Sequence, residues 1–245
     1  MIHYDSNHRN ALSKANSGIN KVEKSNGDDH LLKRCVEDIY KDNLSKRRLK
    51  EGFEIRFDNK ISPSIIKESL IAKGVDPLKL TYLSHISETG KENTIMPDGG
   101  FVYIYDIKTS KVYPILASEQ KRQGTNDTRL KEGKKTQAMG NAIERCGKNF
   151  NLFRDSVCKA ESVVPYVVFC QGCDFEKEFI KNKIRYCISA EINKKQLFRD
   201  EYGLACGYWN VREKTWSKEE ITNILNDVID EVFKHYKDKY DFILD

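Results

Sequence analysis

Two carboxylates and a lysine fall close together in a hairpin that the sequence predicts. Residues 101–105 and 112–117 are rich in β-branched and aromatic side chains and flank a short polar turn. Antiparallel pairing about the middle of that turn places Asp98 opposite Glu119, with both side chains on one face of the sheet. Lys121 lies two positions beyond Glu119 and shares that face. The hairpin therefore predicts two acids and one base together at a strand end.

This cluster has the composition of a magnesium-dependent phosphodiesterase centre. Neighbouring carboxylates repel each other unless a cation lies between them, and Mg²⁺ takes one or two carboxylates plus waters and phosphate oxygens. A lysine beside the ion can position or deprotonate a water, or stabilise charge on the phosphate. The alternative is a strand end with exposed charges and no chemistry. A register slip of one residue is also open, because Pro114 favours an edge position or a bulge.

The segment after the hairpin predicts a basic loop followed by a helix. Residues 122–136 contain two glycines and few apolar side chains. They form either a solvated loop or a mobile arm that closes on DNA phosphates, with Arg122 and Arg129 as candidate contacts. The helix is expected from Asn141 to about residue 157. Asn141 is either its N-cap and nothing more, or a base reader, because its amide matches the N6/N7 edge of adenine.

The remaining segments predict an α/β fold around a buried strand. The apolar run at residues 163–170 is typical of a central strand covered on both faces. Helices are expected near residues 31–44 and 63–74, and Ser217 with Glu220 forms a capping box for a final helix. Further strands are expected at residues 53–57, 78–86, 183–192 and 204–209.

Composition limits the class of protein and its surroundings. The 245 residues suffice for a sizeable core, and the formal charge of +5 permits a nucleic-acid partner without requiring one. Residues 1–29 are polar and predict a flexible arm, so that residues 30–245 form a single domain. The seven cysteines predict free thiols in a reducing cytoplasm, and Cys170 and Cys173 lack the second pair that a zinc site needs. No apolar run approaches the ~20 residues of a membrane span.

Three groups of residues together carry a resemblance to a known family. They are Pro97-Asp98-Gly99-Gly100 with Ala117-Ser118-Glu119-Gln120-Lys121, Gly140-Asn141-Ala142-Ile143-Glu144-Arg145 with Lys148-Asn149, and Pro165-Tyr166-Val167 with Phe169. On these motifs the chain resembles the EcoRI-like type II restriction endonucleases, which include MunI, within the PD-(D/E)xK nuclease superfamily. The likeness covers most of residues 50–235. Its Gly-Asn-Ala-x-Glu-Arg segment is not part of the general superfamily pattern.

The resemblance implies a fold and a catalytic centre. The fold is the restriction-endonuclease-like α/β sandwich around a mixed five-stranded sheet, in a bacterial or archaeal cytoplasmic protein that acts as a homodimer on double-stranded DNA. Asp98, Glu119 and the backbone carbonyl of Gln120 are expected to bind Mg²⁺, with Mn²⁺ as a possible substitute. Lys121 is expected to be the catalytic lysine.

The resemblance also implies the residues that read DNA. Asn141, Ala142 and Arg145 match the readers of an inner AATT, and Glu144 matches the acidic residue that buttresses them. An extended segment along the major groove is expected at Gln137, Ala138, Met139 and Gly140. Lys148, Lys194, Lys195 and Arg199 are further candidate contacts.

This chain departs from the family where the outer base pair is read. EcoRI has Met-Ala-Ala where this chain has Gln137-Ala138-Met139, and MunI has an arginine at the position of Met139. The expected site is GAATTC, with CAATTG or a degenerate AATT site as alternatives.

The activity that the resemblance implies is restriction of foreign DNA by cutting both strands and leaving 5′-phosphates. A methyltransferase in the same system would protect host DNA. Two alternatives stay open: a structure-directed repair or recombination nuclease of the same fold, and a non-catalytic DNA-binding protein.

Overall fold

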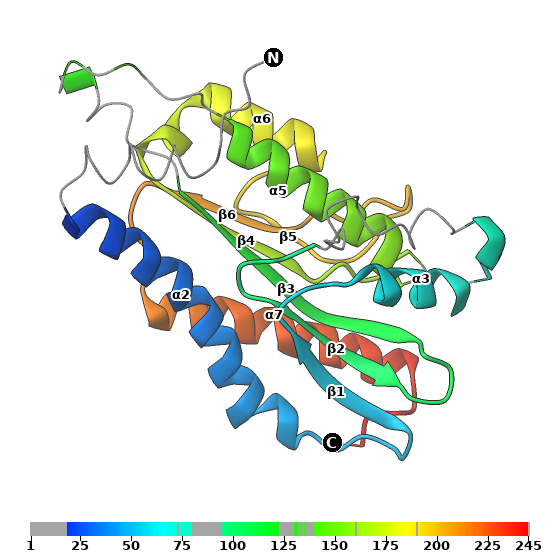
Figure 1. Ribbon diagram of the computed structural model, residues 1–245. Coiled ribbons are helices and arrows are strands. Elements are labelled where there is room, and N and C mark those ends of the chain that lie inside the picture. The colour runs from blue at the N-terminus through cyan, green and yellow to red at the C-terminus, as the bar shows by residue number, and fades with distance from the viewer. Residues whose placement is uncertain are drawn as a thin grey trace.

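A mixed six-stranded sheet forms the centre of the protein (Figure 1). The computed structural model describes residues 19–72, 74–79, 95–122, 130–131, 133, 135, 140–159, 161–189 and 191–244. The strand order is β1-β2-β3-β4-β6-β5. The strands are Phe53–Asp58 (β1), Phe101–Asp106 (β2), Val112–Arg122 (β3), Tyr166–Gln171 (β4), Lys195–Gln196 (β5) and Gly207–Arg212 (β6).

The sheet combines an antiparallel part with a parallel part. β1, β2 and β3 pair antiparallel, whereas β3 pairs parallel with β4, and β4 with β6. β5 adds a short antiparallel edge to β6. The mixed α/β sandwich predicted from the resemblance is confirmed, with six strands instead of five because of the two-residue β5.

Helices cover both faces of the sheet (Figure 1). The helices α2 (Ile19–Asp42) and α7 (Lys218–Lys239) lie on one face, and α3 (Pro63–Ala72), α5 (Asn141–Leu152) and α6 (Glu178–Ile188) lie on the other. A turn of π-helix, η3 (Phe153–Val157), extends α5, and short 3-10 turns occur at Leu44–Lys46 and Cys173–Glu176. No helix in the described part of the chain combines the length and apolar composition needed to cross a membrane.

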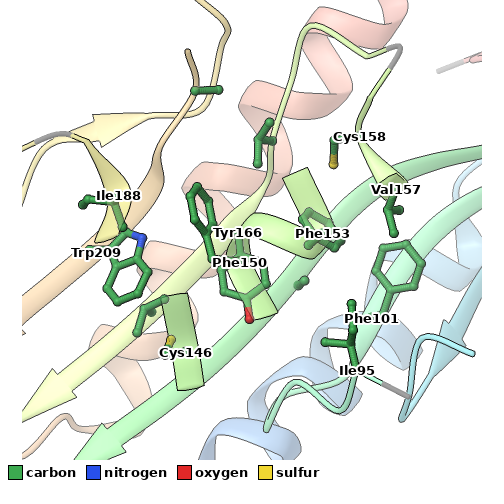
Figure 2. Close-up of a cluster of buried hydrophobic side chains, with 14 of the residues drawn as sticks. Ile95, Phe101, Cys146, Phe150, Phe153, Val157, Cys158, Tyr166, Ile188 and Trp209 are labelled. Atoms are coloured by element: carbon green, nitrogen blue, oxygen red, sulfur yellow. The ribbon is translucent and has the colours of Figure 1, made fainter. Parts of the chain in front are cut away.

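The sequence of the central strand β4 is largely apolar because both faces of this strand are buried. All six of its residues are buried. Val167 and Phe169 pack in the core on the α2 and α7 face, whereas Tyr166, Val168 and Cys170 pack in the core under α5 and α6. Figure 2 shows this second core, where Phe150 and Phe153 from the α5 segment surround Tyr166.

The hairpin contains a β-bulge beside Pro114, one of the two alternatives that this proline indicated. Tyr103 lies opposite Pro114, but its neighbour Val102 lies opposite Leu116, so β3 carries one extra residue between them. The predicted register holds near the turn and shifts by one toward the strand end. Pro114 is tolerated because its missing N–H falls at this irregularity.

Two predicted strands are corrected by the structure. Residues 183–192, expected as a strand, belong largely to α6, whose Ile180, Ile184 and Ile188 recur at helical spacing and are buried. The strand expected at residues 204–209 is β6, which begins at Gly207. The strand expected at residues 78–86 lies mostly outside the described residues.

The N-terminal boundary stays a prediction. Helix α2 begins at Ile19, inside the segment expected as an arm, and residues 1–18 lie outside the described part of the chain. The expected single domain is consistent with two cores that share one sheet.

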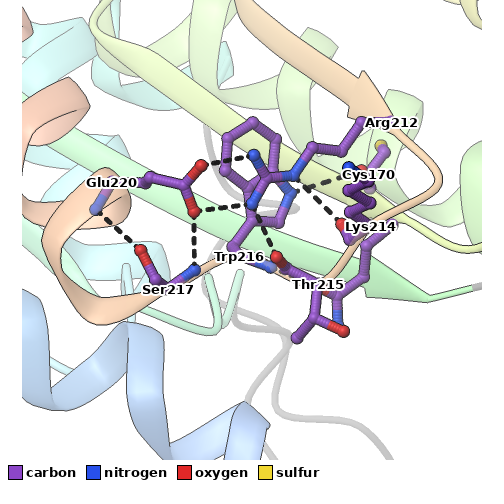
Figure 3. Close-up of polar contacts among 8 residues, drawn as sticks. Cys170, Arg212, Lys214, Thr215, Trp216, Ser217 and Glu220 are labelled. Atoms are coloured by element: carbon purple, nitrogen blue, oxygen red, sulfur yellow. Dashed lines mark hydrogen bonds and ion pairs between the residues drawn. The ribbon is translucent and has the colours of Figure 1, made fainter.

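The capping box of the last helix is confirmed (Figure 3). The Ser217 hydroxyl accepts from the Glu220 N–H, and the Glu220 carboxylate accepts from the Ser217 N–H. The Arg212 guanidinium donates to the same carboxylate and lies 3.5 Å from the centre of the Trp216 ring. This cluster fixes the start of α7 to the end of β6.

Candidate active site

Asp98 lies in a tight turn that is pressed against β3. The Gly100 N–H donates to the Pro97 carbonyl at 2.9 Å, and the Gly99 N–H donates to the Ser118 carbonyl at 2.9 Å. A Cβ atom on Gly99 would collide with the Ser118 hydroxyl oxygen and would lie 3.1 Å from Leu32 Cγ, so glycine allows this close approach without displacing its neighbours. The turn thus brings Asp98 to the end of β3.

The Asp98 carboxylate is held by the backbone of the neighbouring strand. Its Oδ2 accepts from the Gln120 N–H at 2.9 Å. The simple register places Asp98 directly opposite Glu119. The bulge shifts the pairing by one residue, so Asp98 contacts Gln120 instead. The two carboxylates still converge, since Glu119 is the adjacent residue of β3.

Glu119 is a buried carboxylate with two hydrogen-bond donors behind it. Its side chain is 1% exposed. Its Oε1 accepts from the Tyr166 hydroxyl at 2.6 Å and from the Asn149 Nδ2 at 2.8 Å. Burial and the Glu119 charge raise the pKa of Tyr166 well above its usual value, so the phenol remains a donor. β4 and α5 together therefore fix the direction in which Glu119 points.

Lys121 joins the two carboxylates. Its Nζ lies 2.8 Å from Asp98 Oδ2 and 2.8 Å from Glu119 Oε2. Burial alone would lower the pKa of Lys121, but the charges of Glu119 and Asp98 outweigh it and raise the pKa above its usual value. The lysine is therefore a cation at neutral pH.

The donor set at this point fits Mg²⁺. The ammonium of Lys121 shows that a positive charge is accommodated between Asp98 and Glu119. The N–H and C=O of one strand residue point to the same side, so the Gln120 carbonyl faces the Asp98 turn, as its N–H does. Among the described residues, no group of three or more His, Cys, Asp and Glu side chains is arranged to hold a metal ion. A hard ion that needs few protein ligands suits this oxygen set.

The start of α5 presents polar side chains to solvent. Asn141, Glu144, Arg145 and Lys148 are exposed and follow the spacing of one helical face, whereas Ile143 and Cys146 are buried on the opposite face. Asn141 is the first residue of α5 and not its cap, which is a correction. The cap position is held by Gly140, at φ 95°. Ala142 is partly buried beside it.

Two of the side chains expected to contact DNA, Arg199 and Lys195, bond to parts of the protein outside the first turn of α5. Arg199 donates from its guanidinium to the backbone carbonyls of Glu161, Gly203, Arg154 and Cys158. Three of these carbonyls, those of Arg154, Cys158 and Glu161, follow the C-terminal end of α5 in the chain. These hydrogen bonds give Arg199 a structural role that competes with the expected DNA contact, which stays a prediction.

Lys195 is also engaged away from α5. Its Nζ pairs with Asp227 at 2.6 Å and with Glu231, both on α7. Lys194 is exposed beside it. Arg122 lies at the end of β3, where alternation directs its side chain to the face opposite Lys121. Arg129, Gln137, Ala138 and Met139 lie outside the described residues.

Tyr166 and Asn149 contact the candidate centre, which the sequence analysis did not predict. Both belong to the motifs of the resemblance, but only the structure shows that they contact Glu119. The available signal was a tyrosine inside an apolar strand, since a buried phenol needs a hydrogen-bond partner.

One comparison with known proteins identifies the family of this chain. The family model described as restriction endonuclease EcoRI matches residues 13–197 of the 245-residue chain. No curated protein sequence matches the chain. The matched region contains the Asp98 turn, strands β3 and β4, and helices α5 and α6. The chain belongs to the EcoRI family of restriction endonucleases, which are DNA-binding nucleases.

Proposed function

We propose that the protein is a Mg²⁺-dependent type II restriction endonuclease that hydrolyses one phosphodiester bond in each strand of a palindrome with an AATT core. GAATTC is the favoured site and CAATTG the alternative, and each cut leaves a 5′-phosphate. One observation carries the proposal: the Lys121 ammonium lies 2.8 Å from the carboxylates of Asp98 and Glu119. Membership of the EcoRI family supports the reaction class.

The residues of the centre have distinct roles in this proposal. Asp98, Glu119 and the Gln120 carbonyl would hold Mg²⁺, or Mn²⁺ in its place. The bound ion supplies Lewis acidity and lowers the pKa of a water ligand. Lys121 would position the attacking water or help to remove its proton, or would stabilise the negative charge that develops on the phosphate.

The exposed face of α5 supports DNA recognition by this helix. Asn141 offers the donor and acceptor pair that matches adenine, and Arg145 offers donors for base or phosphate acceptors. Ala142 provides a small apolar surface between them, and Lys148 lies one turn further along for a phosphate. A palindromic site calls for two symmetric readers, so we propose a homodimer. We also expect a methyltransferase in the same system, which would protect host DNA.

Digestion of a plasmid of known sequence tests the proposal. With Mg²⁺, we expect discrete fragments whose 5′-phosphate ends map to palindromes containing AATT. Cutting only at flaps or junctions would instead identify a structure-directed nuclease. Sequence-specific binding without cleavage, in Mn²⁺ as well as Mg²⁺, would identify a non-catalytic DNA-binding protein.

A further inference from the structure

Lys183 of α6 contacts the first turn of α5. Its Nζ lies 2.6 Å from Glu144 Oε1, and its side chain is only 23% exposed. Glu144 belongs to the exposed face of α5 with Asn141 and Arg145. One side chain of α6 is thus in direct contact with the end of α5 that is proposed to read DNA.

The stem of the same lysine lies against Gly140. A Cβ atom at Gly140 would lie 2.5 Å from Lys183 Nζ and 2.8 Å from its Cδ. Gly140 also has φ 95°, a conformation that L side chains rarely adopt. Lys183 therefore contacts both the residue before α5 and the acidic residue of its first turn.

The helices approach closely at a second point. A Cβ atom at Gly147 would lie 3.1 Å from the Cβ of Cys187, one turn along α6 from Lys183. Two contacts separated along both helices fix the position of α5 relative to α6 more firmly than one would. The Lys183 contact is the one next to Asn141 and Arg145.

The charge of Lys183 is unfavourable here without Glu144. The N-terminus of a helix carries partial positive charge, so an ammonium beside it is repelled, whereas an acidic side chain in the first turn is favoured. Pairing with Lys183 also neutralises Glu144, whose free carboxylate would repel DNA phosphates from this face. The ion pair therefore suits a surface that must accept a polyanion.

We propose that Lys183 is a positioning residue for sequence discrimination, which holds Gly140 and Glu144 so that Asn141 and Arg145 keep one orientation. The inference rests on the proposed function, because it takes the exposed face of α5 as the DNA-reading surface. A partly exposed ion pair contributes little to folding stability. Its loss should therefore affect discrimination far more than thermal stability.

The test compares the full-length protein with three variants. Lys183→Met keeps the stem and removes the charge, and Lys183→Arg keeps the charge. Lys181→Met is the matched control, because Lys181 lies on the same helix, is 20% exposed and pairs with Glu176 at 3.0 Å. The readout is the ratio of kcat/KM on the mapped site to kcat/KM on a site with one base pair changed.

We expect Lys183→Met to lower this ratio at least about tenfold, the size of one lost base contact. Lys183→Arg should recover most of the ratio, and Lys181→Met should leave it unchanged. An unchanged ratio in Lys183→Met, or an equal fall in Lys181→Met, would overturn the inference. If Lys183→Met does not fold, the same ratio is measured for Lys183→Gln, and the same fall is expected. Failure of the wild-type protein to cut at discrete sites would instead count against the proposed function.

Discussion

At the scale of single residues, hydrogen bonds from two different elements fix Glu119. Tyr166 donates from β4 and Asn149 donates from α5, both to Oε1. The other oxygen, Oε2, is thereby left toward Lys121. Asn149 lies about two turns beyond Asn141 and about one turn beyond Arg145 on the same helix, so a shift of α5 would also change the position of the Glu119 carboxylate.

Removing one of these donors should weaken catalysis without unfolding the protein. Tyr166→Phe keeps the ring in the core and removes the hydroxyl. Partners behind a metal-binding carboxylate typically account for about 10–100-fold in metal affinity or activity. We expect cleavage to need more Mg²⁺, measured as the concentration for half-maximal rate. A Tyr166→Phe variant with the wild-type Mg²⁺ dependence would show that the hydroxyl does not position Glu119.

Asn141 provides a second prediction at this scale. Asn141→Ala should weaken binding to the specific site by roughly 1–3 kcal/mol, the value of one bidentate base contact. Binding to random DNA should change little, measured by competition at one salt concentration. An equal loss on both DNAs would mean that Asn141 contacts phosphate and not a base.

Much of this site could be predicted from the sequence, because strand alternation alone puts Glu119 and Lys121 on one face. The sequence predicted that Asp98 lies close to Glu119 and Lys121, but not which residue of β3 it contacts. The bulge near Pro114 shifts the contact of Asp98 to the Gln120 N–H. Whether a bulge forms depends on tertiary packing, which the local sequence pattern does not show. The roles of Tyr166 and Asn149 could not be predicted, since they depend on how β4 and α5 pack against β3.

At the scale of elements, α6 shows how local patterns fail. Residues 183–192 contain β-branched and aromatic side chains and were predicted as a strand. The helix begins earlier, at Glu178, and its buried Ile180, Ile184 and Ile188 appear as a pattern only over that longer window. The consequence is functional, because the helix places Lys183 beside Glu144.

The segment around Arg199 gives a prediction about stability. Arg199→Met removes the hydrogen bonds to four backbone carbonyls, three of them in residues 154–161 beyond α5. We expect the free energy of unfolding to fall by roughly 2–4 kcal/mol, since hydrogen bonds from a charged donor are the stronger kind. Urea denaturation measures this.

DNA affinity of the folded Arg199→Met variant should match the wild type. Lys194→Met, an exposed change in the same segment, is the control for stability. If Arg199→Met has wild-type stability but binds DNA more weakly, Arg199 contacts DNA and does not stabilise the fold.

At the scale of the whole molecule, two cores share one sheet, and the centre lies at the end of the strand between them. β3 and β4 each contribute side chains to both cores. The α/β class and the central position of β4 could be predicted from its apolar run. The strand order could not, because it depends on which elements pack together after the chain has folded.

The C-terminal helix carries a pH-sensitive group far from the proposed centre. Burial lowers the pKa of His235, as does the charge of Lys239, against smaller opposing effects of Glu161 and Asp238. His235 also contacts the Ser162 hydroxyl at 2.8 Å. The unfolded chain therefore takes up a proton near pH 6.5 before the folded protein does, so stability falls as pH drops through that value.

Exchanging His235 for glutamine should reduce this pH dependence. We expect the free energy of unfolding of the wild type to fall between pH 7.5 and pH 5.5 by more than that of His235→Gln. Urea denaturation at both pH values gives the comparison. Equal slopes would show that His235 does not set this dependence.

The most direct test of the central claim is the cleavage rate of Glu119→Gln on a DNA fragment that carries the mapped site, with Mg²⁺. The substitution keeps the shape of the side chain and removes its charge. The account predicts that cleavage is lost while specific binding to the same fragment is retained. Cleavage by Glu119→Gln at the wild-type rate would contradict it, because Glu119 would then not be part of the nuclease centre.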